Sequence, residues 1–184
     1  RINFIPPTAF PFTTATGTLY DSGDYEKALD AALEASNYKG LRAEQEKRRQ
    51  NKSTKQIGIG VATYVEITGF GGSEYGHISL RPDGTVLATT GATPIGTGHF
   101  TTWAMIVAEK LGIPMEKIEV FHGDTDIVPT GETTGGSRSV QLAGSAMADA
   151  SDKLIEIAKQ KAADLLEASP EDVVLNTQEG EFHV

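Results

Sequence analysis

Two segments of the sequence combine glycine and hydroxyl residues in a pattern that suits anion binding. The first is Gly96-Thr97-Gly98-His99, and the second is Thr134-Gly135-Gly136-Ser137-Arg138-Ser139. A strand is predicted before each segment and a helix after it. A helix start presents unpaired N–H groups and the positive end of the helix dipole, and glycine lets an anionic group approach the backbone closely. We therefore interpret both as candidate phosphate-binding loops; the alternative is that they are flexible connections before capped helices.

Both loops differ from the common nucleotide-binding motifs. Neither contains the Gly-Lys-Ser/Thr of a P-loop or the Gly-x-Gly-x-x-Gly of a dinucleotide fold, which argues against an ordinary ATP or NAD site. The chain also has no Gly-x-Ser-x-Gly, so a hydrolytic triad is unsupported.

Other candidate ligands are acidic residues and histidines. Asp124 and Asp126 form an Asp-x-Asp, which could bind a divalent cation or could accept backbone N–H bonds within a turn. We favour the turn because no third acidic ligand lies close in the sequence. The four histidines lack a zinc-binding spacing. His77 is expected on a strand surface, and His99 is expected to be neutral at its helix start.

The elements that position the loops are predicted from hydrophobic periodicity and turn residues. We expect an α+β fold in which a mixed sheet packs against helices. Its predicted elements are a hairpin of 75–81 and 85–90 around Pro82-Asp83-Gly84, a helix over about 100–111 ended by Gly112, a strand over 118–121, a helix over about 140–168, a helical turn at 169–171 and a hairpin around Glu179-Gly180.

The N-terminal third is predicted to begin with an extended, Pro- and Thr-rich strap over residues 1–20. A helix should follow the capping residues 21–24, with Gly40 ending it or its connection. A polar surface helix is predicted over about 41–52. The clearest strand of the sequence is then 57–68, where apolar residues alternate with glycine and polar residues at period 2.

Composition narrows the classes of function. The 184 residues carry a net charge of −9, from 16 basic and 25 acidic side chains, so we expect no nucleic acid partner. The absence of cysteine excludes disulfides, iron–sulfur clusters and a thiol nucleophile within this chain. No apolar run approaches the ~18 residues of a membrane span, and a cytoplasmic location is expected. The length fits one subdomain over residues 1–184, and the start at Arg1 indicates a piece of a longer protein.

Further motifs occur in a fixed order along the chain. They are Tyr20-Asp21-Ser22-Gly23-Asp24-Tyr25, Leu41-Arg42-Ala43-Glu44-Gln45, Gly58-Ile59-Gly60, Gly98-His99-x-Thr101-Thr102 and Gly123-Asp124-Thr125-Asp126-x-x-Pro129-x-Gly131. Together with Gly136-Ser137-Arg138-Ser139, they make the whole chain resemble the large subunit of the xanthine dehydrogenase and aldehyde oxidase family, in particular its aerobic carbon monoxide dehydrogenase branch.

This resemblance implies a molybdopterin-binding domain in which loops 96–99 and 134–139 bind a molybdopterin dinucleotide with molybdenum. It implies an oxidoreductase that hydroxylates its substrate at molybdenum, with oxygen from water and electrons leaving through iron–sulfur clusters to FAD. Its partners would be the remainder of the large subunit and the iron–sulfur and flavin subunits or domains. The family's catalytic glutamate and substrate loop match nothing here. No catalytic or metal-ligating residue is therefore assigned, and the isolated chain is expected to be inactive.

The chain departs from the family pattern in its first loop. The family often has Gln-Gly-Gln-Gly-His there, whereas Ile95 and Thr97 replace both glutamines, and Phe100 stands where the carbon monoxide branch has Glu. The backbone of the loop can survive these changes, but side-chain contacts to the pterin would be reduced. The alternative function is a non-catalytic binding module that has lost the cofactor. A metal-dependent transferase using Asp124 and Asp126 is a third reading.

A geometric expectation follows from the size of a dinucleotide. Its several phosphate oxygens exceed the donors of one helix start, so the two loops should face each other across one cleft. Arg138 is expected to contact the ligand, with pairing to Asp124, Asp126 or Glu132 as the alternative.

Overall fold

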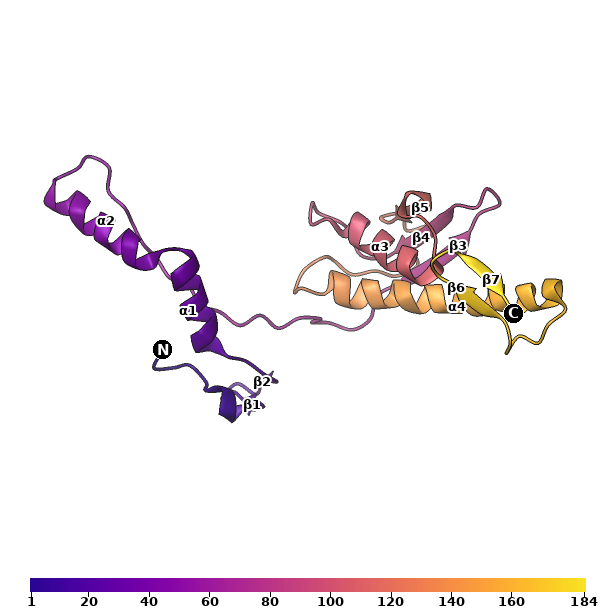
Figure 1. The fold of residues 1–184 in the computed structure, drawn as a ribbon, viewed down its shortest axis with the longest axis horizontal. Coiled ribbons are helices and arrows are strands. Elements are labelled where there is room, and N and C mark those ends of the chain that lie inside the picture. Colours follow the sequence, from indigo (N-terminus) through magenta and orange to yellow (C-terminus); the bar gives the residue numbers. More distant parts are fainter. The chain divides into compact units, whose positions relative to one another are not determined.

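The chain folds into two compact units. The computed structural model describes all of residues 1–184, and the units are Arg1–Thr63 and Tyr64–Val184. Figure 1 labels the helices and strands of both. The sequence predicts one subdomain over 1–184, whereas the boundary between the units falls inside the segment predicted as its clearest strand.

The predicted strand over 57–68 does not form. None of these residues belongs to a strand or a sheet, and the apolar side chains of Val61, Val65 and Ile67 are exposed. No heavy atom lies within 4 Å of the position that a Cβ would take on Gly58 or Gly60. Alternation at period 2 describes a pattern of side chains, but a strand also needs a hydrogen-bonded neighbour, and this chain supplies none.

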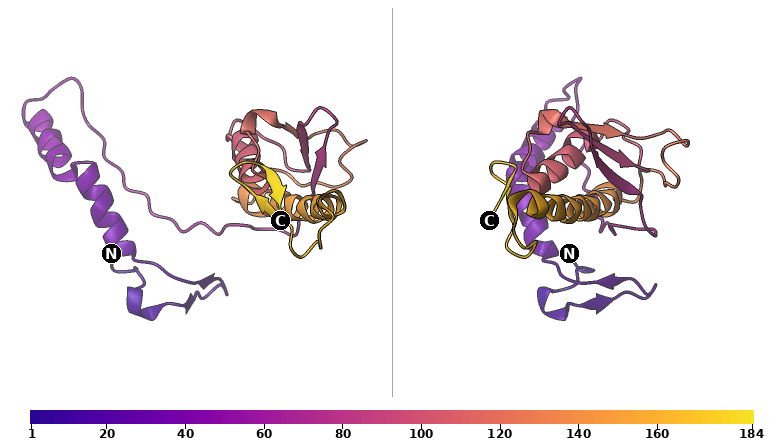
Figure 2. Two further views of the ribbon diagram at one scale, coloured as in Figure 1. Left: turned by 45° about the vertical axis from the view of Figure 1, so that its right-hand side comes forward. Right: turned by 90° about the vertical axis from the view of Figure 1, so that its right-hand side faces the viewer.

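The first unit consists of a short hairpin and two helices. Its elements are a 3-10 turn Pro7–Ala9, β1 (Phe12–Thr13), β2 (Leu19–Tyr20), α1 (Tyr25–Ala35) and α2 (Tyr38–Gln50); Figure 2 shows α1 and α2 following one another along the chain. The carboxylate of Asp24 caps α1 by accepting the Lys27 N–H at 3.1 Å, as the capping run predicts. The predicted extended strap over 1–20 is interrupted by the 3-10 turn and by hydrogen-bonded turns at residues 1–4 and 14–17, the second of which joins β1 to β2.

The break between the two helices lies at Asn37 and not at Gly40. Asn37 has a left-handed backbone with φ 47°, whereas Gly40 lies inside α2. Asparagine adopts this conformation more readily than other residues with a side chain, because its amide can bond locally. The expectation that Gly40 ends α1 or its connection was therefore wrong.

The second unit contains the predicted mixed sheet, which has three strands. Its elements are β3 (Gly76–Leu80), β4 (Val86–Thr90), α3 (His99–Leu111), a 3-10 turn Met115–Lys117, β5 (Ile118–Phe121), a π-helical turn Ser139–Ala143, α4 (Gly144–Leu166), β6 (Val174–Asn176) and β7 (Glu181–His183). β3 and β4 form the predicted antiparallel hairpin, and β5 lies parallel to β4 on its other side. The order β3-β4-β5 places a helical crossover between β4 and β5.

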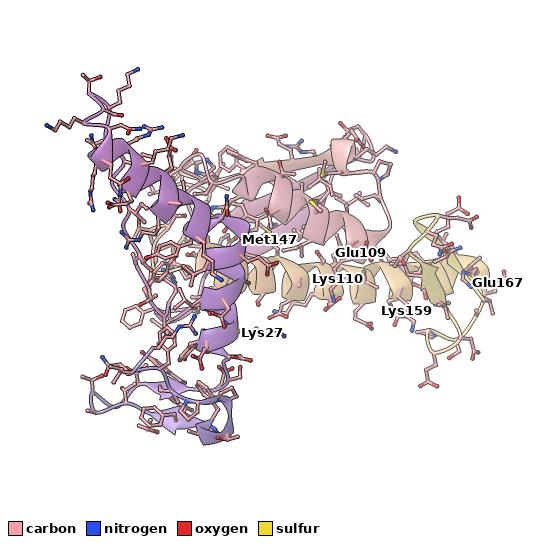
Figure 3. All side chains as sticks on the ribbon, turned by 60° about the vertical axis from the view of Figure 1, so that its left-hand side comes forward. Lys27, Glu109, Lys110, Met147, Lys159 and Glu167 are labelled. Atoms are coloured by element: carbon pink, nitrogen blue, oxygen red, sulfur yellow. The ribbon has the colours of Figure 1, made fainter.

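Helices α3 and α4 pack against this sheet and against each other (Figure 1). The core between them contains Ile78, Val86 and Ala88 from the sheet, Val107 from α3 and Met147 from α4. Met147 is labelled on α4 in Figure 3. None of the helices, α4 included, is long and apolar enough to cross a membrane.

The C-terminal hairpin is anchored on the end of α3. Gly112 ends α3 with φ 69°, and a Cβ there would lie 2.5 Å from the Thr177 carbonyl oxygen, so only glycine fits this contact. The hairpin of β6 and β7 is as predicted. Residues 169–172, where a helical turn is predicted, make one hydrogen-bonded turn, in which the Asp172 N–H donates to the Ser169 carbonyl at 2.9 Å.

Candidate functional site

The first glycine-rich loop ends in the N-terminus of α3. Gly96 and Gly98 have φ of 87° and 77°, and no heavy atom lies within 4 Å of a Cβ built on either. The first helical hydrogen bond runs from the Thr102 N–H to the Gly98 carbonyl at 3.1 Å. The amides of residues 99–101 therefore precede the helical hydrogen-bond ladder.

His99 is held inside this helix start. Its ring is stacked on that of Trp103, with centroids 5.0 Å apart, and its Nδ1 lies 2.9 Å from the Thr97 hydroxyl. The side chain is buried. His99 and Thr97 thus fix the shape of the loop through contacts with each other and with Trp103.

The second glycine-rich loop leads into the π-helical turn before α4. Gly135 and Gly136 are exposed, and Gly135 has no heavy atom within 4 Å of a Cβ position. Ser137 has a left-handed backbone with φ 50°. Widened helical turns of this kind occur often at functional sites. The first hydrogen bond of the turn joins the Leu142 N–H to the Arg138 carbonyl at 2.7 Å.

Two hydrogen bonds join the second loop to residues on either side of the first. The Thr134 hydroxyl donates to the Thr93 carbonyl, just before the first loop, at 2.6 Å. The buried indole of Trp103 in α3 donates to the carbonyl of Ser139 at 3.2 Å. These bonds bring the second loop close to the residues that flank the first loop. That the two loops face each other across one cleft stays a prediction.

The two helices run in the same direction from these loops. Trp103 contacts Ser139, Ile106 lies against Gly144, and Lys110 forms an ion pair with Asp152 at 2.7 Å. In these contacts the residue numbers increase together along both helices, so the helices are parallel. Figure 3 shows Lys110 beside α4. The N-termini of the helical segments from 99 and from 139 therefore lie at the same end, where their dipoles add.

The side chains of the second loop are bonded to the protein itself. Ser139 donates to the Thr134 hydroxyl at 3.0 Å, and Ser137 donates to the Glu66 carboxylate at 2.7 Å. Arg138 is 5% exposed; its guanidinium pairs with Glu132, donates to the Ser73 carbonyl at 3.2 Å and lies 4.0 Å from the Glu74 carboxylate. The groups left for a ligand are consequently backbone amides.

Arg138 pairs with Glu132, one of the three acids named for its alternative role of holding the loop. Its ion pair with Glu132 and its burial are the arrangement expected of a residue that holds the loop. Its Nε is buried without a hydrogen-bond partner. Among Asp124, Asp126 and Glu132, the bonded partner is Glu132.

The Asp-x-Asp segment forms a turn. The Asp124 carboxylate accepts the Asp126 N–H at 2.9 Å, and the backbone carbonyl of Asp124 accepts the N–H of Val128 at 2.8 Å. The structure contains no group of three or more acidic or histidine side chains arranged to hold a metal ion. His77 is exposed on β3, as predicted.

Sequence reasoning missed the residues that support the second loop. Glu66, Ser73 and Glu74 all contact it, although they lie in or beside the segment predicted as strand. The Glu74 side chain is 3% exposed and accepts the Tyr75 and Glu132 N–H groups at 2.9 and 3.3 Å. An available signal was the run Gly69-Phe70-Gly71-Gly72, which marks a close approach of the backbone.

Comparison with known families identifies one match. The family model described as "Molybdopterin cofactor-binding domain" matches residues 31–184, which include both loops.

Individual proteins agree with this match. The chain is 41% identical over 183 residues to the carbon monoxide dehydrogenase large chain of Hydrogenophaga pseudoflava, covering 93% of this chain and 23% of that one. It is 32% identical to xanthine dehydrogenase of Calliphora vicina, covering 82% and 11%. A solved CO dehydrogenase from Oligotropha carboxidovorans matches with a TM-score of 0.76 at 33% identity, over 100% of this chain and 26% of that one. The chain thus spans about a quarter of the length of the carbon monoxide dehydrogenase large chains.

Proposed function

Because the chain belongs to the molybdopterin cofactor-binding domain family, we propose that its two glycine-rich loops bind the phosphates of a molybdopterin dinucleotide through backbone amides. The observation that carries this proposal is the pairing of two helix N-termini at one end of the second unit, joined by the Thr134–Thr93 and Trp103–Ser139 hydrogen bonds. Helix N-termini bind phosphates because unpaired N–H groups and the helix dipole both favour negative charge.

The open glycines fit such a ligand. Gly96, Gly98 and Gly135 each lack any neighbour within 4 Å of a Cβ position, so an anionic oxygen can come close to their backbone. The loop hydroxyls and Arg138 are already bonded within the protein, and they act by fixing the amides in place. Thr134, Ser137, Arg138 and Ser139 are therefore positioning residues, and Thr97 holds His99 in the same way.

This arrangement accommodates the changes at Ile95 and Thr97. Glutamine side chains at those positions would add contacts by side chain, whereas the amides of 96–99 are present with any side chain there. Ile95 and Phe100 are exposed beside the first loop and offer apolar surface, which suits a flat ring system better than a phosphate.

In the larger protein the bound group would supply the redox chemistry of a molybdenum-dependent oxidoreductase. This chain's own part is to bind and orient it, and iron–sulfur and flavin partners would take the electrons. The isolated chain should give no turnover with a dye acceptor, because it has no cysteine for electron-transfer clusters. Turnover by the purified chain would contradict this part of the proposal.

The proposal is tested by titrating the ¹⁵N-labelled chain with pyrophosphate. Amides of residues 96–101 and of 134–140 should shift together and saturate with a single dissociation constant, because one ligand is shared. Shifts in one loop alone, or in neither, would contradict shared binding.

Two glycine variants make the test specific. Gly135→Ala should leave the fold intact, since the site is open and φ is not in the left-handed region, yet its methyl group would occupy the ligand's approach. Binding should weaken by about tenfold, equivalent to ~1.4 kcal/mol. Gly60→Ala, equally open but in the first unit, is the matched control and should bind as the wild type does. Molybdenum and pterin analysis of the full-length protein then separates a cofactor-binding enzyme from a module that has lost the cofactor.

A further inference from the structure

Residues 64–74, which we name the brace, lie against residues 136–138 of the second loop. The Gly69 N–H donates to the Ser137 carbonyl at 3.3 Å, and the Ser137 hydroxyl donates to the Glu66 carboxylate at 2.7 Å. A Cβ on Gly136 would lie 3.4 Å from the Phe70 Cβ, and Arg138 donates to the Ser73 carbonyl at 3.2 Å. Three consecutive loop residues, 136–138, therefore each contact the brace.

Ser137 is the member of this set that needs support. Its φ of 50° is left-handed, a conformation that is unfavourable for a residue with a Cβ and persists only where the surroundings hold it. The brace holds Ser137 at two points, by its hydroxyl through Glu66 and by its carbonyl through Gly69. The backbone of the loop thus depends on contacts from outside the loop.

Polar contacts, not apolar burial, secure the brace. Val65, Ile67 and Phe70 are exposed, so hydrophobic packing of their side chains contributes little. Its C-terminal end is fixed by the buried Glu74 carboxylate, which accepts the Glu132 N–H. Between Tyr64 and Ser73, the side chain that bonds to the loop is that of Glu66.

We infer that Glu66 is a positioning residue for the phosphate-binding loop, an inference that rests on the proposed function of that loop. By accepting the Ser137 hydroxyl, its carboxylate keeps residues 135–139 in the conformation that binds the anion. A carboxylate beside an anion would by itself weaken binding through Coulomb repulsion. The positioning role of Glu66 should strengthen anion binding, whereas its negative charge should weaken it. Substitutions that remove one effect and keep the other can therefore separate them.

Three variants of the full chain are compared by pyrophosphate titration. Glu66→Ala removes the acceptor and the charge, and binding should weaken by about three- to tenfold, the range of one hydrogen bond. Glu66→Gln removes the charge but keeps an acceptor oxygen, so binding should equal or exceed that of the wild type. Glu156→Ala removes one exposed charge from α4 and should change nothing. Tighter binding by Glu66→Ala would show that Glu66 acts only as a charge, and would overturn the inference.

A second readout needs no ligand. In the free chain, Glu66→Ala should shift the amide resonances of 135–139 and speed their hydrogen exchange, while amides of the sheet stay unchanged. In a Ser137→Gly background, where glycine takes the left-handed backbone freely, Glu66→Ala should have little further effect on the loop. Unchanged loop amides in Glu66→Ala would overturn the positioning role. A disturbed loop in a chain whose wild type binds no pyrophosphate would uphold that role and reject the proposed function instead.

Discussion

The indole N–H of Trp103 donates to the backbone carbonyl of Ser139 across 36 residues of sequence, at 3.2 Å. Trp103 lies in α3, one turn after the first loop, and Ser139 is the last residue of the second loop. Trp103 is fully buried, and its ring also packs with Ala92 and Ala143. The Trp103 side chain therefore links the helix that follows the first loop to the end of the second loop.

Trp103→Phe should destabilise the second unit by about 1–3 kcal/mol, because the buried Ser139 carbonyl loses its donor while an aromatic ring is kept. Unfolding by urea, followed by circular dichroism, measures this; fluorescence is unsuitable because Trp103 is the sole tryptophan. Phe100→Leu, at an exposed position of the same helix, serves as control and should change stability little. Equal stability of Trp103→Phe and the wild type would show that the hydrogen bond contributes nothing.

Thr134→Val should loosen both loops together. It removes the hydroxyl that donates to the Thr93 carbonyl and accepts from Ser139, at nearly constant side-chain volume. We expect a loss of about 1–2 kcal/mol of stability and faster hydrogen exchange at 96–99 as well as at 135–139. Thr133→Val, at the exposed neighbouring position, is the matched control. Faster exchange confined to the second loop would contradict the bridging role of Thr134.

Asp124→Ala should destabilise the turn after β5 by about 0.5–1.5 kcal/mol, because the Asp126 N–H loses its acceptor. Asp126→Ala should have a smaller effect. Calorimetric titration of the wild-type chain with Mg²⁺ or Mn²⁺ should detect no micromolar site, since the Asp124 carboxylate is used within the turn. Micromolar binding that Asp126→Ala abolishes would support the transferase reading instead.

The Asp83 carboxylate should stabilise the β3–β4 turn at neutral pH, and this stabilisation should be lost in acid. Hydrogen bonds from the Thr85 hydroxyl and, next, from the Thr85 N–H lower the pKa of the Asp83 carboxyl below its ordinary 3.8. A carboxyl with a lowered pKa in the folded state stabilises that state above pH 3.8, and this contribution is lost as the pH falls through the folded-state pKa. Thr85→Val should raise the pKa of Asp83 toward 3.8, as measured by NMR titration of its carboxyl. An unchanged pKa would assign the shift to the backbone N–H alone.

Sequence alone was sufficient for the elements whose signals are local. Asp24 caps α1, Pro82-Asp83-Gly84 turns the β3–β4 hairpin, and Gly112 ends α3 as the sequence predicts. Each depends on the conformational preference of a few adjacent residues. The two glycine-rich loops were recognisable for the same reason, because glycine, hydroxyl residues and a following helix are all adjacent in the sequence.

Long-range pairing had to come from the tertiary structure. The alternation over 57–68 is a true property of the sequence, but no strand of this chain lies beside it, so no sheet forms there. Arg138 could pair with any of three nearby acids, and the fold selects Glu132. Glu66 carries no mark in the sequence as a partner of Ser137, 71 residues away. Local preferences fix the conformation of a residue, whereas hydrogen bonds between distant segments depend on which surfaces the core brings together.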